Sequence, residues 1–361
     1  MKNHKNVIVI NPGAATTKIA LYTDKKELWS DELFHAKEEI AVFKSSIEQL
    51  EYRKNKVLEA LEQKDFDLAD LDAAIGRGGP VKPLPGGVYK VGPELLKDLS
   101  NPGAVDHASI LGGLIAYELS KIANVPAYIA DPISVDEFDD LARISGLPEI
   151  KRPALSHALN VKAVALEIAE KQGKKLEEVN YIVAHLGSGF TISPLRNGRI
   201  IDTNSANDAG PMTPMRSGTL PNQAFVKLCY SGEYTYKEMM NKLLRNSGLT
   251  GHLGTSDVKE ISARIANGDE KARLCLEAMA YQISKDIGAC AAILKGDVDA
   301  IILTGGVAYD KNVVGWITER VSFIAPIIVR PGQKEMQALA DHAFNALDGT
   351  EIANDYATSG V

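Results

Sequence analysis

The chain has 361 residues, of which 45% are apolar and 24% are charged, and its formal net charge at pH 7 is −7. This length predicts two domains, and the acidic balance offers no general basic surface for nucleic acid or for an anionic membrane. Three cysteines are too few for a disulfide framework, and no stretch approaches the ~20 apolar residues of a membrane span. The apolar run near the N-terminus is also too short for a signal peptide, so we expect a cytoplasmic globular protein.

Apolar strands alternate with amphipathic helices, which predicts an α/β fold. In chain order the expected elements are strands at 7–10 and 19–22, a helix within 31–64, a strand at 73–75, a helix at 109–123, a strand at 125–130, a helix at 156–172, a strand at 181–184, a long helix at 274–294, a strand at 300–303 and a final helix at 334–347. Residues 7–22 and 181–195 share one pattern of apolar strand, small-residue turn and second strand. This repeat favours two duplicated domains that face a shared cleft.

Small-residue turns follow three of the buried strands, at 11–17, 185–189 and 305–306. Backbone N–H groups in such turns can bind phosphate oxygens, and open α/β sheets place ligands at the carboxyl ends of their strands. Each turn alone is readily explained as ordinary turn chemistry, but the three together favour a nucleotide site. The sequence contains no GxxxxGK[ST] motif, and no strand is followed by GxGxxG, so neither a P-loop nor a Rossmann site is predicted.

Two arginines stand in glycine-rich surroundings, Arg77 in Gly-Arg-Gly-Gly and Arg216 in Met-Arg-Ser-Gly. Arginine binds carboxylate and phosphate through two parallel hydrogen bonds, although a single arginine is usually a solvated surface residue. Asp131 ends a predicted strand, where it could hold Mg²⁺ through water, orient an arginine or simply terminate the strand. The seven histidines form no HxxxH pair, and no GxSxG elbow occurs, so neither a zinc site nor a hydrolase triad is predicted.

Taken in this order, the motifs resemble the acetate kinase family of the sugar kinase/Hsp70/actin superfamily, and within it the butyrate kinase group. The most specific pieces are Asn-Pro-Gly-Ala-Ala-Thr-Thr-Lys at 11–18, Gly-Arg-Gly-Gly at 76–79, Ala-His-Leu-Gly-Ser-Gly at 184–189, Met-Arg-Ser-Gly at 215–218 and Leu-Thr-Gly-Gly-Val at 303–307. The resemblance covers essentially the whole chain. It implies two duplicated RNase H-like (actin-like ATPase) domains with ATP in the cleft between them. The implied domains are 1–155 plus 336–361, and 156–335.

The resemblance also implies a role for each matching residue. The residues implied in binding ATP or ADP are Asn11, Thr16, Lys18, His185, Gly187, Ser188, Gly189, Gly305 and Gly306. The implied catalytic residues are Arg77, Arg216 and Asp131. Asn11 and Glu335 are implied in holding Mg²⁺.

Two departures from the acetate kinases narrow the expected substrate. Acetate kinases carry Asn where Ser188 stands. They also carry a Phe-His-Gly-Thr-Ser-His segment, of which residues 152–157 keep only the final Ser-His, with Pro153 in the place of the histidine that helps to stabilise the transition state. The butyrate-type kinases share this second departure. The expected substrate is therefore butyrate rather than acetate, with branched acids such as isobutyrate and isovalerate, or acetate and propionate, as alternatives.

The implied reaction is the reversible, direct transfer of the γ-phosphoryl group of ATP to a small carboxylic acid, which gives an acyl phosphate and ADP. The implied partners are these small molecules and further copies of the chain, at least as a homodimer, with no nucleic acid and no membrane. Two other classes of function use the same fold. A nucleotide-switch protein of the actin or Hsp70 kind would not need two arginines, and a sugar kinase would need an aspartate base, a role open to Asp131.

Overall fold

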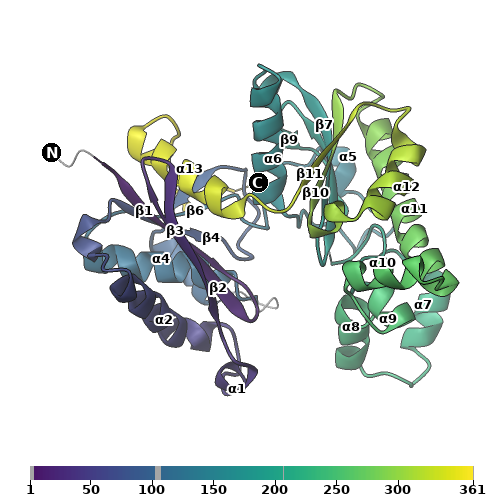
Figure 1. Cartoon of the computed structure of the whole chain (residues 1–361), viewed down its shortest axis with the longest axis horizontal. Helices are drawn as coiled ribbons and strands as arrows, with labels where there is room; N and C mark the ends of the chain where they lie inside the picture. Colours follow the sequence, from purple (N-terminus) through teal and green to yellow (C-terminus); the bar gives the residue numbers. More distant parts are fainter. Residues whose placement is uncertain (1–3, 102–106, 206, 361) are drawn as a thin grey trace. The chain divides into compact units, whose positions relative to one another are not determined.

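The computed structural model describes residues 4–101, 107–205 and 207–360, and the contacts divide the chain into two compact units (Figure 1). The first unit comprises Met1–Glu137 and Lys334–Val361, and the second comprises Phe138–Gln333. Among the described residues, no helix is both long and apolar enough to cross a membrane.

A six-stranded sheet forms the centre of the first unit, in the order β3-β2-β1-β4-β6-β5. Its strands are β1 (Asn6–Pro12), β2 (Thr16–Thr23), β3 (Lys26–Phe34), β4 (Ala73–Arg77), β5 (Val88–Lys90) and β6 (Ala127–Ala130). Strands β1, β4 and β6 are parallel neighbours, whereas β2, β3 and β5 pair antiparallel. The carboxyl ends of the three parallel strands therefore lie along one edge of the sheet.

Helices cover both faces of this sheet. The helices of this unit are α1 (Lys37–Ile40), α2 (Leu50–Gln63), α3 (Pro93–Ser100), α4 (Ile110–Ala123) and α13 (Glu335–Asp348), with short 3-10 turns η1 (Ile47–Gln49) and η2 (Leu68–Asp70). Helices α2 and α4 pack with Ile8 and Ile10 of β1 in one apolar core, and α13 packs on β1 and β4 from the other side (Figure 1). Because both faces are covered, β1 is buried along nearly its whole length, which explains its continuous apolar sequence.

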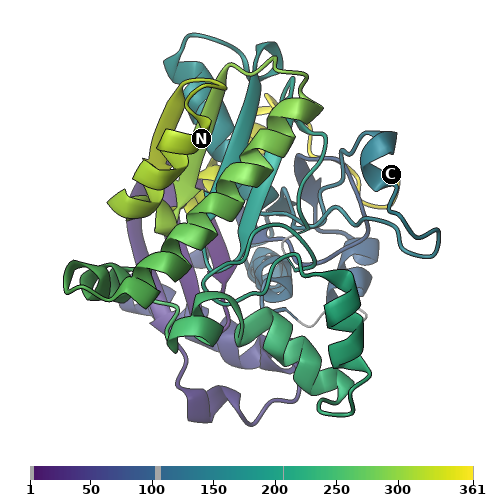
Figure 2. The same cartoon turned by 90° about the vertical axis from the view of Figure 1, so that its right-hand side faces the viewer.

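The second unit has a five-stranded sheet in the order β11-β10-β7-β8-β9. Its strands are β7 (Asn180–Leu186), β8 (Phe190–Arg196), β9 (Arg199–Ile200), β10 (Ala300–Gly305) and β11 (Ile327–Pro331). Its helices are α5 (Asp140–Arg143), α6 (Ala158–Lys171), α7 (Asn222–Cys229), α8 (Tyr236–Arg245), α9 (Gly248–Leu253), α10 (Val258–Ala266), α11 (Glu270–Ile293) and α12 (Lys311–Val321), with 3-10 turns η3 (Leu176–Glu178) and η4 (Gly306–Tyr309). The long helix α11 packs against β7 and β8, with α12 beside it (Figure 2).

The two sheets repeat one strand order. The first unit runs β3-β2-β1-β4-β6 and the second runs β9-β8-β7-β10-β11, so that each strand of one series has a counterpart in the other. The antiparallel hairpin of β1 and β2 corresponds to that of β7 and β8, and a parallel strand follows on the other side of β1 and of β7. The expectation of two duplicated α/β domains is confirmed.

The structure corrects one predicted element. The helix expected over 31–64 forms only in part, because β3 extends to Phe34, α1 covers only Lys37–Ile40 and α2 begins at Leu50. Strand β3 is an edge strand that pairs with β2, and along it only Trp29 and Leu33 are half-buried. The apolar residues at helical intervals that predicted the helix begin only at Ile40, beyond this strand, and pairing with β2 holds residues 31–34 extended.

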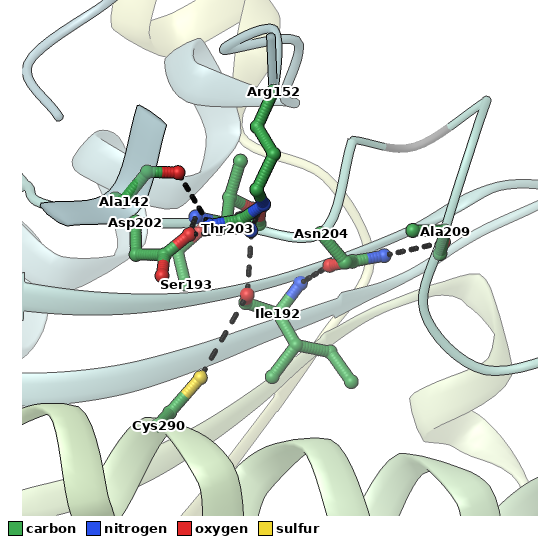
Figure 3. A network of polar contacts seen from close by, with 9 residues as sticks. All are labelled: Ala142, Arg152, Ile192, Ser193, Asp202, Thr203, Asn204, Ala209 and Cys290. Atoms are coloured by element: carbon green, nitrogen blue, oxygen red, sulfur yellow. Dashed lines mark hydrogen bonds and ion pairs between the residues drawn. The ribbon is translucent and has the colours of Figure 1, made fainter. Parts of the chain in front are cut away.

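The contacts place the segment 138–155 in the second unit, whereas the expected crossing points lay near 155 and 335. The guanidinium of Arg152 donates hydrogen bonds to Asp202 at 2.7 Å, to the carbonyl of Ala142 at 2.6 Å and to that of Thr203 at 2.9 Å (Figure 3). The backbone N–H of Asp139 donates to the carbonyl of Ile201 at 3.0 Å. These bonds attach the segment to the β8–β9 region, so the contact boundary falls after Glu137.

A cavity of about 250 Å³ adjoins this network. It lies beside β8 and α11, and its lining includes Arg152, Asp202, Asn204, Asp286 and Cys290. The polar groups drawn in Figure 3 bond largely to one another, since Asn204 accepts from the N–H of Ile192 and donates to the carbonyl of Ala209. None of the residues expected to bind nucleotide or acid lines this cavity. We therefore assign the network a structural role.

Candidate active site

Three of the expected residues stand at the carboxyl ends of the parallel strands of the first unit. Asn11 lies near the end of β1, Arg77 is the last residue of β4, and Asp131 follows β6. The strand registers pair Ile10 with Gly76 and Arg77 with Ala130, which brings these ends to one edge of the sheet. This edge is where α/β sheets bind their ligands.

Asn11 and Arg77 meet Glu335, which comes from the far end of the sequence. One carboxylate oxygen of Glu335, Oε2, accepts a hydrogen bond from Asn11 Nδ2 at 2.8 Å and another from Arg77 Nη1 at 3.0 Å. Glu335 is the first residue of α13 and is only 4% exposed, whereas the Arg77 side chain retains 18% of its exposure. The start of a helix favours a carboxylate, and its N-terminal dipole here adds to the two donors. The guanidinium of Arg77 is thereby held at the sheet edge by a buried anion.

The donor set around Glu335 fits Mg²⁺. Mg²⁺ keeps several of its waters and is usually bound by one or two carboxylates rather than by a cage of protein ligands. Among the residues that the structure describes, no cluster of three or more His, Cys, Asp or Glu forms a metal cage. In this described part of the chain, no protein group donates a hydrogen bond to Asn11 Oδ1 or to Glu335 Oε1. Both oxygens are therefore available to accept hydrogen bonds from metal-bound water.

The turn between β1 and β2 is held by a buried arginine to which no sequence pattern pointed. Arg53 of α2 is fully buried, and its guanidinium donates to the carbonyls of Gly13, Ala14 and Thr16 at 2.8–3.0 Å. Its remaining bonds go to Gln49 and to Thr17 Oγ1. These bonds fix the carbonyl groups of the turn toward the interior. The single arginine in a helical stretch of charged residues gave no signal for this role.

Thr16 and Lys18, the other residues expected at this turn, lie on β2. Thr16 is half-buried, and its carbonyl accepts bonds from Gly13 N–H and from Arg53. Lys18 is exposed and stands opposite Asn11 in the strand register. Thr16 therefore belongs to the turn itself, whereas Lys18 flanks it.

Asp131 is held on both of its carboxylate oxygens. Oδ1 accepts the N–H of Gly87 at 2.7 Å, and Oδ2 lies 3.3 Å from Nε2 of His342 in α13. The other ring nitrogen of His342 lies 2.8 Å from Glu351. Burial by itself lowers the pKa of His342, but the two carboxylates outweigh it and raise that pKa to about 10. His342 is therefore an imidazolium at neutral pH, and the sequence offered no pattern that pointed to it.

In the second unit, His185 is positioned by two residues at the start of α6, the N-cap residue His157 and Asn160 of its first turn. Asn160 Nδ2 donates to His185 Nδ1 at 2.8 Å, and the ring of His157 stacks on that of His185 with centroids 4.2 Å apart. Because Nδ1 accepts this bond, the other ring nitrogen, Nε2, carries the proton. A Cβ placed on Gly187 would lie 3.2 Å from Nε2, so this N–H borders the second turn. In the sequence, His157 stood out only as the end of the Ser-His at 156–157, and nothing pointed to Asn160.

Arg216 packs directly on the second turn. A Cβ on Gly189 would lie 2.4 Å from Arg216 Nη1 and 2.6 Å from Cζ, so only glycine leaves room for the guanidinium here. Thr213 Oγ1 donates to the carbonyl of the exposed residue Ser188 at 2.8 Å, which ties the 213–216 segment to the same turn. Burial lowers the pKa of Arg216, because desolvation disfavours its charge. An anionic ligand would relieve this cost.

Gly305 and Gly306 form the third small-residue turn, which lies at the end of β10 in the second unit. Gly305 ends β10 with φ at +90°, and a Cβ there would lie 2.4 Å from the carbonyl oxygen of Leu186, so no other residue fits. Thr304 pairs with His185 in the strand register, which brings the glycine pair next to the second turn. Gly306 is exposed at the start of the 3-10 turn η4.

The structure thus groups the expected residues within each unit. In the first unit it joins Asn11, Arg77 and Glu335 by hydrogen bonds and sets Asp131 on the same sheet edge. In the second unit one loop edge gathers the residues His185, Gly187, Ser188, Gly189, Arg216, Gly305 and Gly306.

Comparison with known proteins identifies the family of the chain. Residues 152–324 match the model of the acetokinase family. Over 97% of the chain and 99% of the relative, the sequence is 47% identical to "Probable butyrate kinase 2" of Caldanaerobacter subterraneus subsp. tengcongensis and 44% identical to butyrate kinase 2 of Clostridium acetobutylicum. The acetate kinase of Porphyromonas gingivalis shares the fold, with a TM-score of 0.78 at 20% identity over 94% of this chain and 99% of that one. The chain belongs to the acetokinase family, alongside the butyrate kinases.

Proposed function

We propose that the protein is a butyrate kinase, which transfers the γ-phosphoryl group of ATP to the carboxylate of butyrate and releases butyryl phosphate and ADP. The observation that carries this proposal is the meeting of Arg77 with Asn11 and Glu335 at the ligand-binding edge of the first sheet. It is supported by 44–47% identity to proteins named butyrate kinases over almost the whole chain.

The chemistry needs no general base. A short-chain carboxylic acid is ionised at pH 7, so one of its oxygens can attack the γ-phosphorus directly. The bond from that phosphorus to the β–γ bridging oxygen breaks in line with the attack, and ADP leaves with the electron pair. The barrier is then mainly the cost of bringing two anions together and of stabilising the charge on the transferred phosphoryl oxygens.

We assign that electrostatic work to the two arginines. Arg77 is oriented by Glu335, and the half-buried Arg216 is seated against Gly189. Both can donate paired hydrogen bonds to carboxylate or phosphate oxygens. Asn11 and Glu335 would hold Mg²⁺, which, when bound, neutralises part of the charge on the phosphates.

Each unit carries loop residues to which we assign nucleotide contacts. In the first unit these are Asn11, Thr16 and Lys18. In the second unit His185, Gly187, Ser188 and Gly189 would bind phosphate oxygens through N–H groups, and Gly305 and Gly306 would border the adenosine. Within the loops of the second unit, a Cβ at Gly189 or at Gly305 would collide with neighbouring groups, whereas Gly306 has open space around it.

The geometry disfavours a sugar kinase. That reaction needs a carboxylate free to take a proton from a hydroxyl group. Asp131, the residue available for this role, already pairs with the cationic imidazole of His342 and accepts the N–H of Gly87. We therefore assign Asp131 an orienting role at the site.

The test is acyl phosphate formation from MgATP, trapped as the hydroxamate, with acetate, propionate, butyrate, isobutyrate and isovalerate side by side. We expect butyrate to turn over best. Arg77→Ala and Arg216→Ala should each lower kcat on the order of 10²–10³, as loss of other electrostatic stabilisers does. Arg273→Ala is the matched control, because Arg273 pairs with Glu270 and Glu277 on the surface of α11.

Either of two results would overturn the proposal. If no acid is phosphorylated although MgATP binds, the protein is not a carboxylate kinase. If acetate or a branched acid is preferred, the reaction stands but the substrate changes, since one methylene or branch changes binding by only ~1–3 kcal/mol.

We also propose a cytoplasmic enzyme that forms a homo-oligomer, at least a dimer. Its three cysteines are free thiols, as a reducing compartment requires. Apolar side chains are exposed in the segment that follows Glu137, where the chain passes from the first unit to the second. Leu141 is 87% exposed and Ile144 is 73% exposed. Such surfaces commonly mark contacts between proteins, and sedimentation equilibrium measures the assembly directly.

A further inference from the structure

We propose that His342 is the positioning residue for Asp131: held between Asp131 and Glu351, it fixes the Asp131 carboxylate in one orientation and removes it from proton transfer. This inference rests on the proposed function, because it concerns how an orienting carboxylate of that site is kept in place. It adds a residue of α13 and one of the C-terminal segment to the groups that govern the reaction.

The first argument is the geometry of the imidazole. Nε2 lies 3.3 Å from Asp131 Oδ2, and Nδ1 lies 2.8 Å from one oxygen of Glu351 and 2.9 Å from the other. A neutral imidazole has one N–H donor and cannot donate to carboxylates at both nitrogens, whereas an imidazolium can. The arrangement is therefore complete only when the ring is charged.

The second argument is the backbone of Asp131. Its φ is +38°, in the left-handed region that residues with a Cβ seldom occupy. Its N–H donates to the carbonyl of Gly87 at 3.0 Å, and Oδ1 accepts the N–H of Gly87 at 2.7 Å. The backbone and one oxygen are thus fixed by Gly87, and the second oxygen is fixed by His342. An uncommon conformation supported on every side is typical of functional sites.

The third argument is charge. The Asp131 side chain is only 2% exposed, and a buried carboxylate without a partner is costly. The titratable groups around His342 are Asp131, Glu351 and the neighbouring Asp341 of α13, and all three are acidic. The imidazolium is therefore the cation that balances Asp131, and a balanced carboxylate is a poor proton acceptor.

The experiment measures acyl phosphate formation by His342→Gln and Glu351→Gln. Outer-shell partners of functional ligands typically contribute about 10–100-fold, so we expect His342→Gln to lower kcat by that factor and to leave KM for ATP within about twofold. Glu351→Gln keeps an acceptor for Nδ1 and should cause a smaller loss. His4→Gln is the control, because exposed His4 pairs with Asp24 in the same unit, outside the site.

A second readout does not depend on activity. Nitrogen-15 NMR of the histidine-labelled wild type at pH 8 should show both ring nitrogens of His342 protonated, in a signal that is absent from His342→Gln. This measurement also covers the case in which His342→Gln fails to fold, since Glu351→Gln then serves to assign the signal through its shift.

The outcomes separate the inference from the proposed function. If the wild type forms no acyl phosphate, the proposed function fails, and NMR still reports the state of the ring. If the wild type is active, the inference is overturned either by a neutral His342 at pH 8 or by a folded His342→Gln with unchanged kcat. A variant that only melts at lower temperature, with normal kcat, would identify a purely structural contact.

Discussion

The two units support the same strand–turn–strand hairpin in different ways. The turn between β1 and β2 rests on a buried cation, the guanidinium of Arg53, which binds the carbonyl groups of the turn from the inside. The turn between β7 and β8 adjoins the neutral pair Asn160 and His185, and its cation, Arg216, packs against Gly189. In the first unit the charge belongs to the scaffold, and in the second we propose that it binds a ligand.

This difference shows how a duplicated fold can divide its work. The strand order and the hairpin register are shared, so the backbone geometry of both turns follows from the duplication. The supporting side chains come from elements outside the hairpins, α2 in one case and the 213–216 segment in the other. Such elements can change without disturbing the sheet.

The largest effect is expected when the buried guanidinium of Arg53 is removed. Arg53→Met deprives three carbonyls of the first turn of their donor, and we expect it to lower the free energy of unfolding by about 2–5 kcal/mol and to raise KM for ATP. Arg53→Lys should recover part of both, because it keeps the charge but has fewer donors. Urea denaturation measures the stability, with the half-exposed Lys56→Met on the same helix as the control.

An unchanged stability of Arg53→Met would mean that the turn holds its shape without the guanidinium. The buried cation would then make no difference between the two hairpins in stability.

A methyl group added to a glycine of either turn tests whether the two turns have different roles. At Gly189 a Cβ would lie 2.4 Å from Arg216 Nη1, whereas at Gly13 the nearest atom would be 3.5 Å away, an ordinary contact. Because the end of an arginine side chain can move, Gly189→Ala should spare stability but displace the guanidinium, and we expect kcat to fall by about 10–100-fold. Gly13→Ala should stay within about twofold of the wild type in the same assay. Equal losses at both glycines would contradict the different roles assigned to the two turns.

The smallest effect concerns pH. His35 Nε2 bonds to Thr17 Oγ1 beside Arg53, and burial together with the charge of Arg53 lowers the pKa of His35 to about 4 from an ordinary 6.5. Between these pH values the unfolded chain binds a proton that the folded chain does not. The free energy of unfolding should therefore fall as the pH drops from 6.5 to 4, by up to about 1.4 kcal/mol per pH unit from this group.

Denaturation at a series of pH values measures that slope. His35→Gln should reduce it, and a slope that is the same in the variant would show that other groups set the acid sensitivity.

The sequence predicted the parts of the fold that are encoded locally. Continuous apolar runs such as Val7–Ile10 marked the buried strands, and the repeated strand–turn–strand pattern indicated the duplication. Edge strand β3 was missed because most of its residues are exposed and four are charged, so that only its pairing with β2 makes it a strand. The small helices α7, α8, α9 and α10 were not predicted either, since each is short and only lightly buried.

For the candidate site, the residues that carry motifs could be named, but their partners could not. Glycine-rich turns and the arginines beside them are visible in the chain order. Arg53, His342 and Asn160 have their roles through contacts with residues far away in sequence, and a single residue in a helix carries no trace of such a contact. The roles of the expected residues remain proposals, which the kinetic experiments above test.

The path of the chain also decides the order in which the molecule can be completed during synthesis. The second unit is one continuous segment, so its core can close as soon as that segment has left the ribosome. The first unit begins earlier but must wait for α13, which brings Leu339 and Phe344 to the open face of its sheet and delivers Glu335 to Arg77. The domain that is started first is thus finished last, and a nascent chain holds no complete site until its final helix emerges.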